Sequence, residues 1–581
     1  MPRSLRFSGS AAQTPPAPAP STRPQLEACV GRLGDAARRF AGLRVDTRLR
    51  LLRSMRAGYA RTVPRSIEAC CRAKRIVPGT AQEADEWALG PWPVMRHLRL
   101  LIEALSALGR RQDTAPVELG RTADGRLSLE LFPDSALDAL LFPGIRMEAH
   151  ARAGIGGHEL AASRAAFYRQ SPGHGCVVLV LGAGEAAAVP IQDVLTKMFN
   201  EGKVCLLKLH PINAYLGPLV EEAFAEAIAQ DFLQLAYGDD EVGRYLSGHP
   251  GVDEIHLGGS HETHERILWG ADPREREDRK VRRHPLHGKP VTSVLGCVSP
   301  VLIVPGPYLD RQLAFQAHAL AGAMVQNAGL SGHTPRLLVT PRGWPQRDAF
   351  LRHLEDALTV APLRLAYLPG TAERWERVTE GRVELRTVGA PVAGMLPWTL
   401  VPHLDPEDRR EPLFSTLSRC PVLGEVEIGS TDPLEYLQQA VGFLNERVWG
   451  TLAVTMIVHP RTQADRHLAA AVERAITQLR YGAVGVNVWP ALLSALGSPP
   501  WGAHPGAGVA DVQSGRGWVH NTIMLDQIEK AVIRQSLTVQ LKPPHLPGHR
   551  SAGVLLRRLT SVERGAGWAG LPGVLEAALR G

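Results

Sequence analysis

Residues 176–184, CVVLVLGAG, form a short apolar run that ends in glycines. A buried parallel strand followed by a tight turn has this composition. Three similar runs follow, each after a segment of helical pattern: KVCLLKL at 203–209, LQLAYG at 233–238 and EIHLGGS at 254–260. This β-α-β-α-β-α-β order predicts an α/β fold with a doubly wound parallel sheet, in which a nucleotide site lies at the carboxyl ends of the strands.

The regions on either side of this sheet have different patterns. Residues 25–110 repeat apolar side chains at helical spacing, which predicts packed helices with no chemistry of their own. A second α/β region begins at SPVLIVPG (299–306) and continues through VWGTLAVTMIVHP (448–460). The Gly-, Pro- and Trp-rich residues 485–508 then predict loops over a cleft.

Composition is that of a globular chain of two to four domains, with 581 residues, 44% hydrophobic and 21% charged. No apolar run predicts a transmembrane helix, and residues 1–24 read as a disordered tail and not as a secretory signal. The seven cysteines include no C-x-x-C pair, so we expect no metal site and a reducing, cytoplasmic compartment.

The net charge of +7 raises the question of nucleic acid binding. The positive charge is spread along the chain, and the densest basic stretch, PREREDRKVRRH at 273–284, also contains acids. No aromatic residues alternate with these charges to form a stacking platform. The pattern favours a solvated surface insertion, so we expect neither a nucleic acid partner nor a membrane partner.

Over residues 176–340 the order of segments resembles the aldehyde dehydrogenase superfamily, and GDDEVGRYLSGHPGVDEIHLGGS (238–260) is the most specific part. The likeness extends over roughly residues 25–545. It implies a dinucleotide-binding domain at 25–148 and 170–294 and a catalytic-type domain at 295–520. It also implies a small oligomerisation arm with a C-terminal segment at 149–169 and 521–581. An NAD or NADP cofactor, an aldehyde substrate and a homo-oligomer are expected from the same likeness.

The resemblance implies three cofactor-binding residues. Lys208 matches a lysine that reaches the adenosine ribose, and Gly259 with Ser260 matches a loop that admits the pyrophosphate at a helix start. The alternatives are a surface lysine whose stem is buried and a plain turn at the end of a strand. Because the glutamate that would hold the nicotinamide ribose is replaced by Thr416 or Leu417, we expect weak binding of NAD or NADP.

The catalytic positions depart from the family's pattern. The nucleophilic cysteine of N-x-G-x-x-C aligns with Gly332, and the general base that opens E-L-G-G aligns with Val294. The oxyanion-donating asparagine aligns with Glu185, 23 residues before Lys208. The chain therefore resembles a divergent member of the superfamily that lacks the catalytic cysteine.

Other residues near these positions are weaker candidates. Cys297 lies close to the lost base but reads as a buried core cysteine, since no paired base is evident. Ser331 and His333 supply a hydroxyl and an imidazole, but residues two apart on a loop rarely face each other.

Two functions therefore remain open. The family likeness predicts an NAD(P)-dependent oxidoreductase acting on aldehyde or oxo groups, catalytically impaired or inactive at the replaced positions. The alternative is a non-catalytic dinucleotide-binding or scaffold protein that pairs with a partner.

Overall fold

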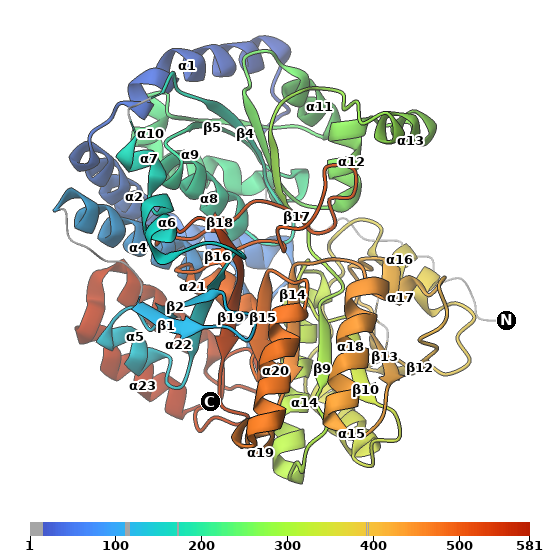
Figure 1. The fold of residues 1–581 in the computed structure, drawn as a ribbon. Helices are drawn as coiled ribbons and strands as arrows, with labels where there is room; N and C mark the ends of the chain where they lie inside the picture. Colours follow the sequence, from blue (N-terminus) through green and yellow to red (C-terminus); the bar gives the residue numbers. More distant parts are fainter. Residues whose placement is uncertain (1–15, 111–116, 171–172, 391, 393) are drawn as a thin grey trace.

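The computed structural model describes residues 16–110, 117–170, 173–390, 392 and 394–581. Its strands form a six-stranded sheet, an eleven-stranded sheet and a two-stranded ribbon (Figure 1). Most of the expected tail, residues 1–15, lies outside the described residues. Ser21 already hydrogen-bonds to the backbone of Tyr237, just before the first helix begins.

The six-stranded sheet confirms the doubly wound α/β prediction. Its strands lie in the order β17-β8-β7-β4-β5-β6, and all neighbours are parallel except β17 and β8. Every residue of β4, β5, β6 and β7 is buried, as expected for apolar runs covered on both faces. The strand bounds are β4 (Val177–Leu181), β5 (Val204–Lys208), β6 (Leu233–Ala236), β7 (Glu254–Gly258), β8 (Val291–Val294) and β17 (Gly515–Arg516).

Helices connect these strands as the sequence predicts. The connections are α8 (Ala188–Leu195) with the π-helical η1 (Thr196–Asn200), then η2 (Pro211–Leu216), α9 (Gly217–Ala223) and α10 (Ala225–Ala229), then α11 (Asp240–Gly248), and last α12 (His261–Trp269) and α13 (Pro273–Val281). The basic segment forms α13, which has no buried residue and projects at the edge of the molecule (Figure 1).

The N-terminal region is helical, and α1 packs on β4, β5 and β6. In α1 the residues Leu26, Val30, Leu33 and Phe40 are buried at helical spacing, so the periodicity marks a core face. The helices are α1 (Arg23–Ala41), α2 (Val45–Ala73), α3 (Glu83–Ala88) and α4 (Pro91–Gly109).

The eleven-stranded sheet has a parallel centre that runs from β19 to β12. In spatial order its strands are β1 (Val117–Arg121), β2 (Leu127–Phe132), β3 (Arg146–Ala151), β19 (Ile528–Arg534), β15 (Ala483–Val486), β14 (Ala453–Ile457), β9 (Pro300–Ile303), β10 (Leu337–Pro341), β13 (Val422–Ile428), β12 (Trp398–Leu404) and β11 (Arg386–Val388).

The remaining elements surround this sheet. The ribbon pairs β16 (Pro500–Trp501) with β18 (Val519–His520). The helices are α14 (Asp310–Val325), η3 (Gln326–Gly329), α15 (Arg347–Thr359), α16 (Thr371–Thr379), α17 (Pro412–Ser415), α18 (Pro433–Arg447), α19 (Pro460–Ala464), α20 (Arg466–Gln478) and α21 (Ala491–Leu496).

The expected arm differs from the structure in its extent. The C-terminal strand β19 does pair with β3, but β19 also pairs in parallel with β15, so the arm continues the large sheet. Residues 157–169 form α6 (Gly157–Ser163) and α7 (Ala166–Arg169), and β1 and β2 lie before the expected boundary, with α5 (Ala136–Leu141) between β2 and β3. The domain boundaries and the homo-oligomer stay predictions.

A buried ion-pair network attaches the C-terminal segment, which comprises α22 (Ala552–Ser561), η4 (Val562–Ala566), η5 (Gly567–Gly570) and α23 (Leu571–Leu579). Arg96 of α4 contacts Asp138 at 2.8 Å and Glu563 at 2.9 Å, and none of the three side chains is more than 1% exposed. Burial alone would lower the pKa of Arg96, but the two carboxylates raise it above its usual value. Among the described residues, no helix is long and apolar enough to cross a membrane.

We expect Arg96→Ala to lower the free energy of unfolding by about 3 kcal/mol, because it removes the fully buried cation that Asp138 and Glu563 share and leaves them only the partly exposed Arg99. Urea unfolding followed by circular dichroism measures the change. Arg580→Ala is the control, since Arg580 pairs with Glu576 on the surface and its loss changes stability by less than about 0.5 kcal/mol. Equal effects of the two substitutions would contradict this assignment.

Candidate functional site

A pocket of about 460 Å³ lies at the carboxyl ends of β4, β5 and β7. It brings together the three residues expected to bind a cofactor and one of the replaced catalytic residues, since its lining includes Lys208, Gly259, Ser260 and Glu185. Arg419, from the loop before β13, also lines it. The pocket therefore joins the dinucleotide-type sheet to the loops of the second α/β region.

Lys208 is the last residue of β5 and is only 6% exposed. Within the described part of the chain, its ammonium group has no hydrogen-bond or ion-pair partner. Burial lowers the pKa of Lys208, and the nearby Asp240 and Asp239 partly offset this effect. A buried cation without a partner is costly, so its place at the pocket wall fits a ligand that supplies ribose hydroxyls or phosphate oxygens.

Gly259 and Ser260 lead into the nine-residue helix α12. The hydroxyl of Ser260 caps the helix, accepting a hydrogen bond from the Thr263 amide at 3.1 Å. The helix start thus faces the pocket with its positive dipole end, which favours an anion such as a pyrophosphate. A Cβ on Gly258, one residue earlier, would lie 3.2 Å from the buried Asp193, so the glycine lets β7 pack closely against α8.

The positions of the nucleophile and the oxyanion donor lie side by side. The Gly332 amide donates to Glu185 Oε1 at 3.3 Å, and a Cβ built on Gly332 would lie 3.1 Å from the same oxygen. It would also lie 3.1 Å from the Cα of Gly296. Glu185 therefore crowds the space in which a side chain at position 332 would stand, and its carboxylate would have to shift to admit one.

Val294, at the position of the base, ends β8 next to this point. Its carbonyl accepts a hydrogen bond from the Gly259 amide at 3.2 Å, while its aliphatic side chain has no atom that accepts a proton. Two residues later, Gly296 lies against Gly332 and Leu417. The three positions that the resemblance expects to be catalytic thus lie in one region, although none carries the expected group.

Arg419 lies in this pocket, although no sequence pattern predicted it. Its Nη1 contacts Glu185 Oε2 at 2.7 Å, and its Nη2 donates to the carbonyl oxygen of Gly259 at 2.7 Å. A left-handed backbone at Arg419, with φ 43°, accompanies this orientation. The only signal in the sequence is a charged residue immediately before the buried Cys420. The alignment drew attention instead to Thr416 and Leu417, at the position of the ribose-holding glutamate.

A loop of unusual backbone geometry carries Gly332. Asn327, Ala328 and Gly329 are consecutive left-handed residues, with φ values of 52°, 58° and 72°. The Asn327 amide group donates to the carbonyl of Glu185 at 2.6 Å and accepts from Lys74 and Tyr367. Strained backbone of this kind persists only where surrounding contacts hold it, and these contacts tie the loop to Glu185.

The substitute candidates do not form a nucleophile and base. Cys297 is fully buried, burial raises the pKa of its thiol, and its sulfur contacts Ser299 and the backbone of Ala453. This agrees with a core cysteine.

Ser331 and His333 face different partners. The Ser331 hydroxyl accepts from Asn327 at 3.2 Å. The His333 ring packs instead against Trp489 and Trp501, at centroid distances of 5.4 and 5.9 Å. Burial lowers the pKa of His333 to about 4, so the ring is neutral at pH 7. Neither residue therefore activates the other.

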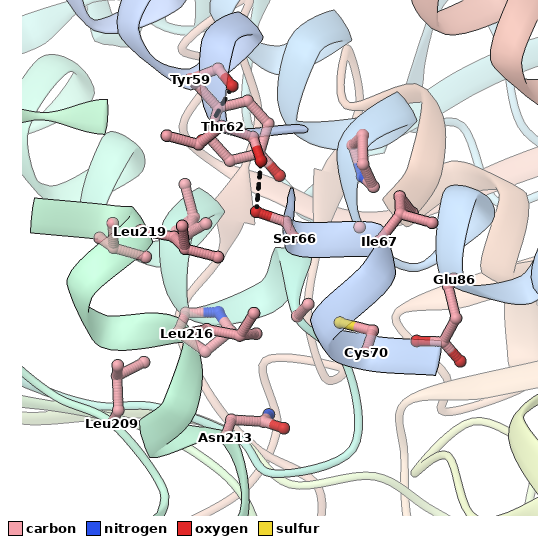
Figure 2. Close-up of a pocket in the computed structure, with 16 residues that line it drawn as sticks. Tyr59, Thr62, Ser66, Ile67, Cys70, Glu86, Leu209, Asn213, Leu216 and Leu219 are labelled. Atoms are coloured by element: carbon pink, nitrogen blue, oxygen red, sulfur yellow. Dashed lines mark hydrogen bonds between the residues drawn. The ribbon is translucent and has the colours of Figure 1, made fainter. Parts of the chain in front are cut away.

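A second, smaller cavity lies behind the Glu185 loop, between α2 and α9 (Figure 2). Its volume of about 20 Å³ is room for one water molecule, and apolar side chains such as Ile67, Leu216 and Leu219 line most of it. Asn213, on its wall, donates to the carbonyl of Gly184 at 3.1 Å. This cavity is too small for a substrate, and its Asn213 wall supports the loop that carries Glu185.

Neither a family model nor a curated protein matches this chain in sequence. Solved structures do match its fold. A γ-glutamyl-γ-aminobutyraldehyde dehydrogenase from Burkholderia cenocepacia is 17% identical with a TM-score of 0.58, covering 89% of both chains. A salicylaldehyde dehydrogenase from Pseudomonas putida, solved with salicylaldehyde, is 14% identical with a TM-score of 0.58, covering 90% of this chain and 92% of that one.

An NADP-dependent glyceraldehyde-3-phosphate dehydrogenase from Bacillus halodurans, solved with NADP, is also 14% identical. Its TM-score is 0.58, and the match covers 88% of this chain and 92% of that one. The chain therefore has the fold of the aldehyde dehydrogenase superfamily, as the sequence resemblance predicts.

We expect Gly332→Cys alone to give no aldehyde-dependent NADH, because the new side chain meets Glu185 and still has no base. Crowding at this site should also lower stability by about 1 to 3 kcal/mol. The triple variant Gly332→Cys, Val294→Glu, Glu185→Asn should give a larger rate, since these groups act as a unit. Absorbance at the NADH band measures the rates of the single and the triple variant. Strong activity of the single variant would show that the position is mapped wrongly.

Proposed function

We propose that this chain binds the adenosine diphosphate part of NAD or NADP around Lys208 and does not oxidise aldehydes through a covalent thiohemiacetal. The observation that carries the proposal is the position of Glu185, which fills the space beside Gly332 and pairs with Arg419. The pocket thus has two parts. Its outer part, around Lys208 and the start of α12, has groups that can bind a ligand. Its inner part, around Glu185 and Gly332, has none of the groups that react in the family's enzymes.

The outer part supports binding of an adenosine diphosphate. Lys208 supplies a buried cation that has no partner among the described residues, and the start of α12 supplies backbone donors for a phosphate. Arg266, also on the lining, pairs with Asp240 at 3.5 Å and lies on the exposed rim. These features favour the half of the cofactor that carries negative charge.

The inner part does not fit the nicotinamide half. A bound nicotinamide would accept a hydride, which requires its ring to stand beside the reacting carbon. Here Arg419 runs from Gly259 to Glu185 across the approach to Gly332. The residue expected to hold the nicotinamide ribose is also lost, since Thr416 is exposed and Leu417 packs against Gly296.

The reacting groups of the thiohemiacetal route are absent from the positions that need them. Gly332 has no thiol to attack a carbonyl, and Val294 has no atom to take a proton. Glu185, which pairs with Arg419, is a hydrogen-bond acceptor at the position where the oxyanion needs a donor. Its Oε1 also accepts the hydrogen bond of the Gly332 amide, so this backbone donor is not free for a developing oxyanion.

This combination supports a ligand-binding or scaffold role in place of turnover. A homo-oligomer, expected from the resemblance, remains part of the proposal, as does a pairing with another protein.

For the unmodified protein we expect no NADH or NADPH formation with aliphatic or aromatic aldehydes. The reason is that no covalent adduct forms without a thiol at position 332, so no hydride is released. An absorbance assay over an aldehyde panel measures this, with an active aldehyde dehydrogenase as positive control. Aldehyde-dependent NADH that survives changes at Cys297, Ser331 and His333 would overturn the catalytic half of the proposal.

For binding, we expect Lys208→Ala to weaken NAD and NADP by roughly ten- to a hundred-fold, the range for a lost hydrogen bond to a charged group. Isothermal titration calorimetry measures the affinity. Arg282→Ala, which removes an exposed cation outside the pocket lining, serves as control. Tight NAD binding that ignores Lys208 would refute the proposed site.

A further inference from the structure

Arg419 forms the wall of the pocket next to the start of α12, where it contacts the Gly259 carbonyl. We infer that the pocket takes a free nucleoside diphosphate, such as ADP, in preference to an intact dinucleotide. The inference rests on the proposed binding site around Lys208 and names its ligand class.

The spacing of the binding groups sets the length of the ligand. Lys208 ends β5 and Gly258 ends β7, and β4 lies between these two strands. Two strand spacings separate the groups by roughly 10 Å. A ribose at Lys208 therefore places its diphosphate at the start of α12, where Gly259 and Ser260 lie.

Beyond that point the chain itself occupies the path that a dinucleotide would follow. The Arg419 guanidinium is bonded to the Gly259 carbonyl at 2.7 Å and to Glu185 at 2.7 Å, and these side chains are only 14% and 12% exposed. Leu368 adds an apolar wall to the same pocket. Glu185 in turn stands against Gly332, so a second ribose and its base would have to displace the Glu185–Arg419 pair to lie there.

The same arginine suits a terminal phosphate. Two contacts use two of the five N–H donors of the Arg419 guanidinium, so donors remain for phosphate oxygens. A terminal phosphate carries more negative charge and one more free oxygen than the phosphodiester inside a dinucleotide, and an arginine binds such a group through paired hydrogen bonds.

The charges around the pocket agree with a polyanion. Lys208, Arg244, Arg266 and Arg419 line it against two acids, Glu185 and Asp240. Both acids have ion-pair partners, whereas Lys208 and Arg244 have none within the described residues. Two cations therefore stay available to a ligand that ends in a diphosphate.

The test is calorimetry of the full-length protein with ADP, AMP and NAD. We expect ADP to bind at least tenfold more tightly than either AMP, which lacks the second phosphate, or NAD. Arg419→Ala should weaken ADP by roughly tenfold or more and bring the ADP and NAD affinities together. Arg419→Lys should keep part of the preference, and circular dichroism checks that each variant is folded.

Arg282→Ala is the matched control, an arginine whose side chain is 71% exposed and lies outside the pocket lining. The inference is overturned if NAD binds the unmodified protein as tightly as ADP, or if Arg419→Ala leaves the preference unchanged. The proposed function has a separate test: if Lys208→Ala weakens neither ligand, or if no nucleotide binds, the binding site itself is refuted.

Discussion

The parallel register of β4 with its two neighbours is the constraint on which the pocket depends. Leu181 lies opposite Lys208 of β5 on one side and Leu257 of β7 on the other, so three strands end at one level. Strands buried on both faces hold such a register firmly, because a slip of one residue would reverse every side chain. The cation on β5 and the helix start after β7 therefore face one shared space.

The ion pair between Glu185 and Arg419 decides what this space can do. It joins the loop after β4 to the loop before β13, two segments 234 residues apart in the chain. Removing one partner of a largely buried pair leaves the other charge uncompensated, which costs more than the pair contributes. The pair therefore holds the two loops together across the approach to Gly332. The part of the pocket around Lys208, Gly259 and Ser260 stays open.

The sequence predicted the parts of this arrangement that depend on local pattern. Short apolar runs predicted β4, β5 and β7, and motif spacing placed Gly332 and Glu185 in one region. Arg419 was out of reach because its role comes from a left-handed backbone and a distant partner, neither of which leaves a local pattern. The continuation of β3 and β19 into the large sheet depends on the pairing of β19 with β15, a long-range contact that strand patterns do not specify.

The residues at 185, 332 and 419 are physically interdependent. A glutamate fits at position 185 because Gly332 has no side chain, and its charge is tolerated because Arg419 compensates it. Arg419 in turn spans the approach only while Glu185 and the Gly259 carbonyl accept its hydrogen bonds. A thiol at 332 would thus require the glutamate carboxylate to shift, and an asparagine at 185 would leave the arginine without its anion. The three residues form one self-consistent arrangement, and the proposed binding of a charged ligand rests on it.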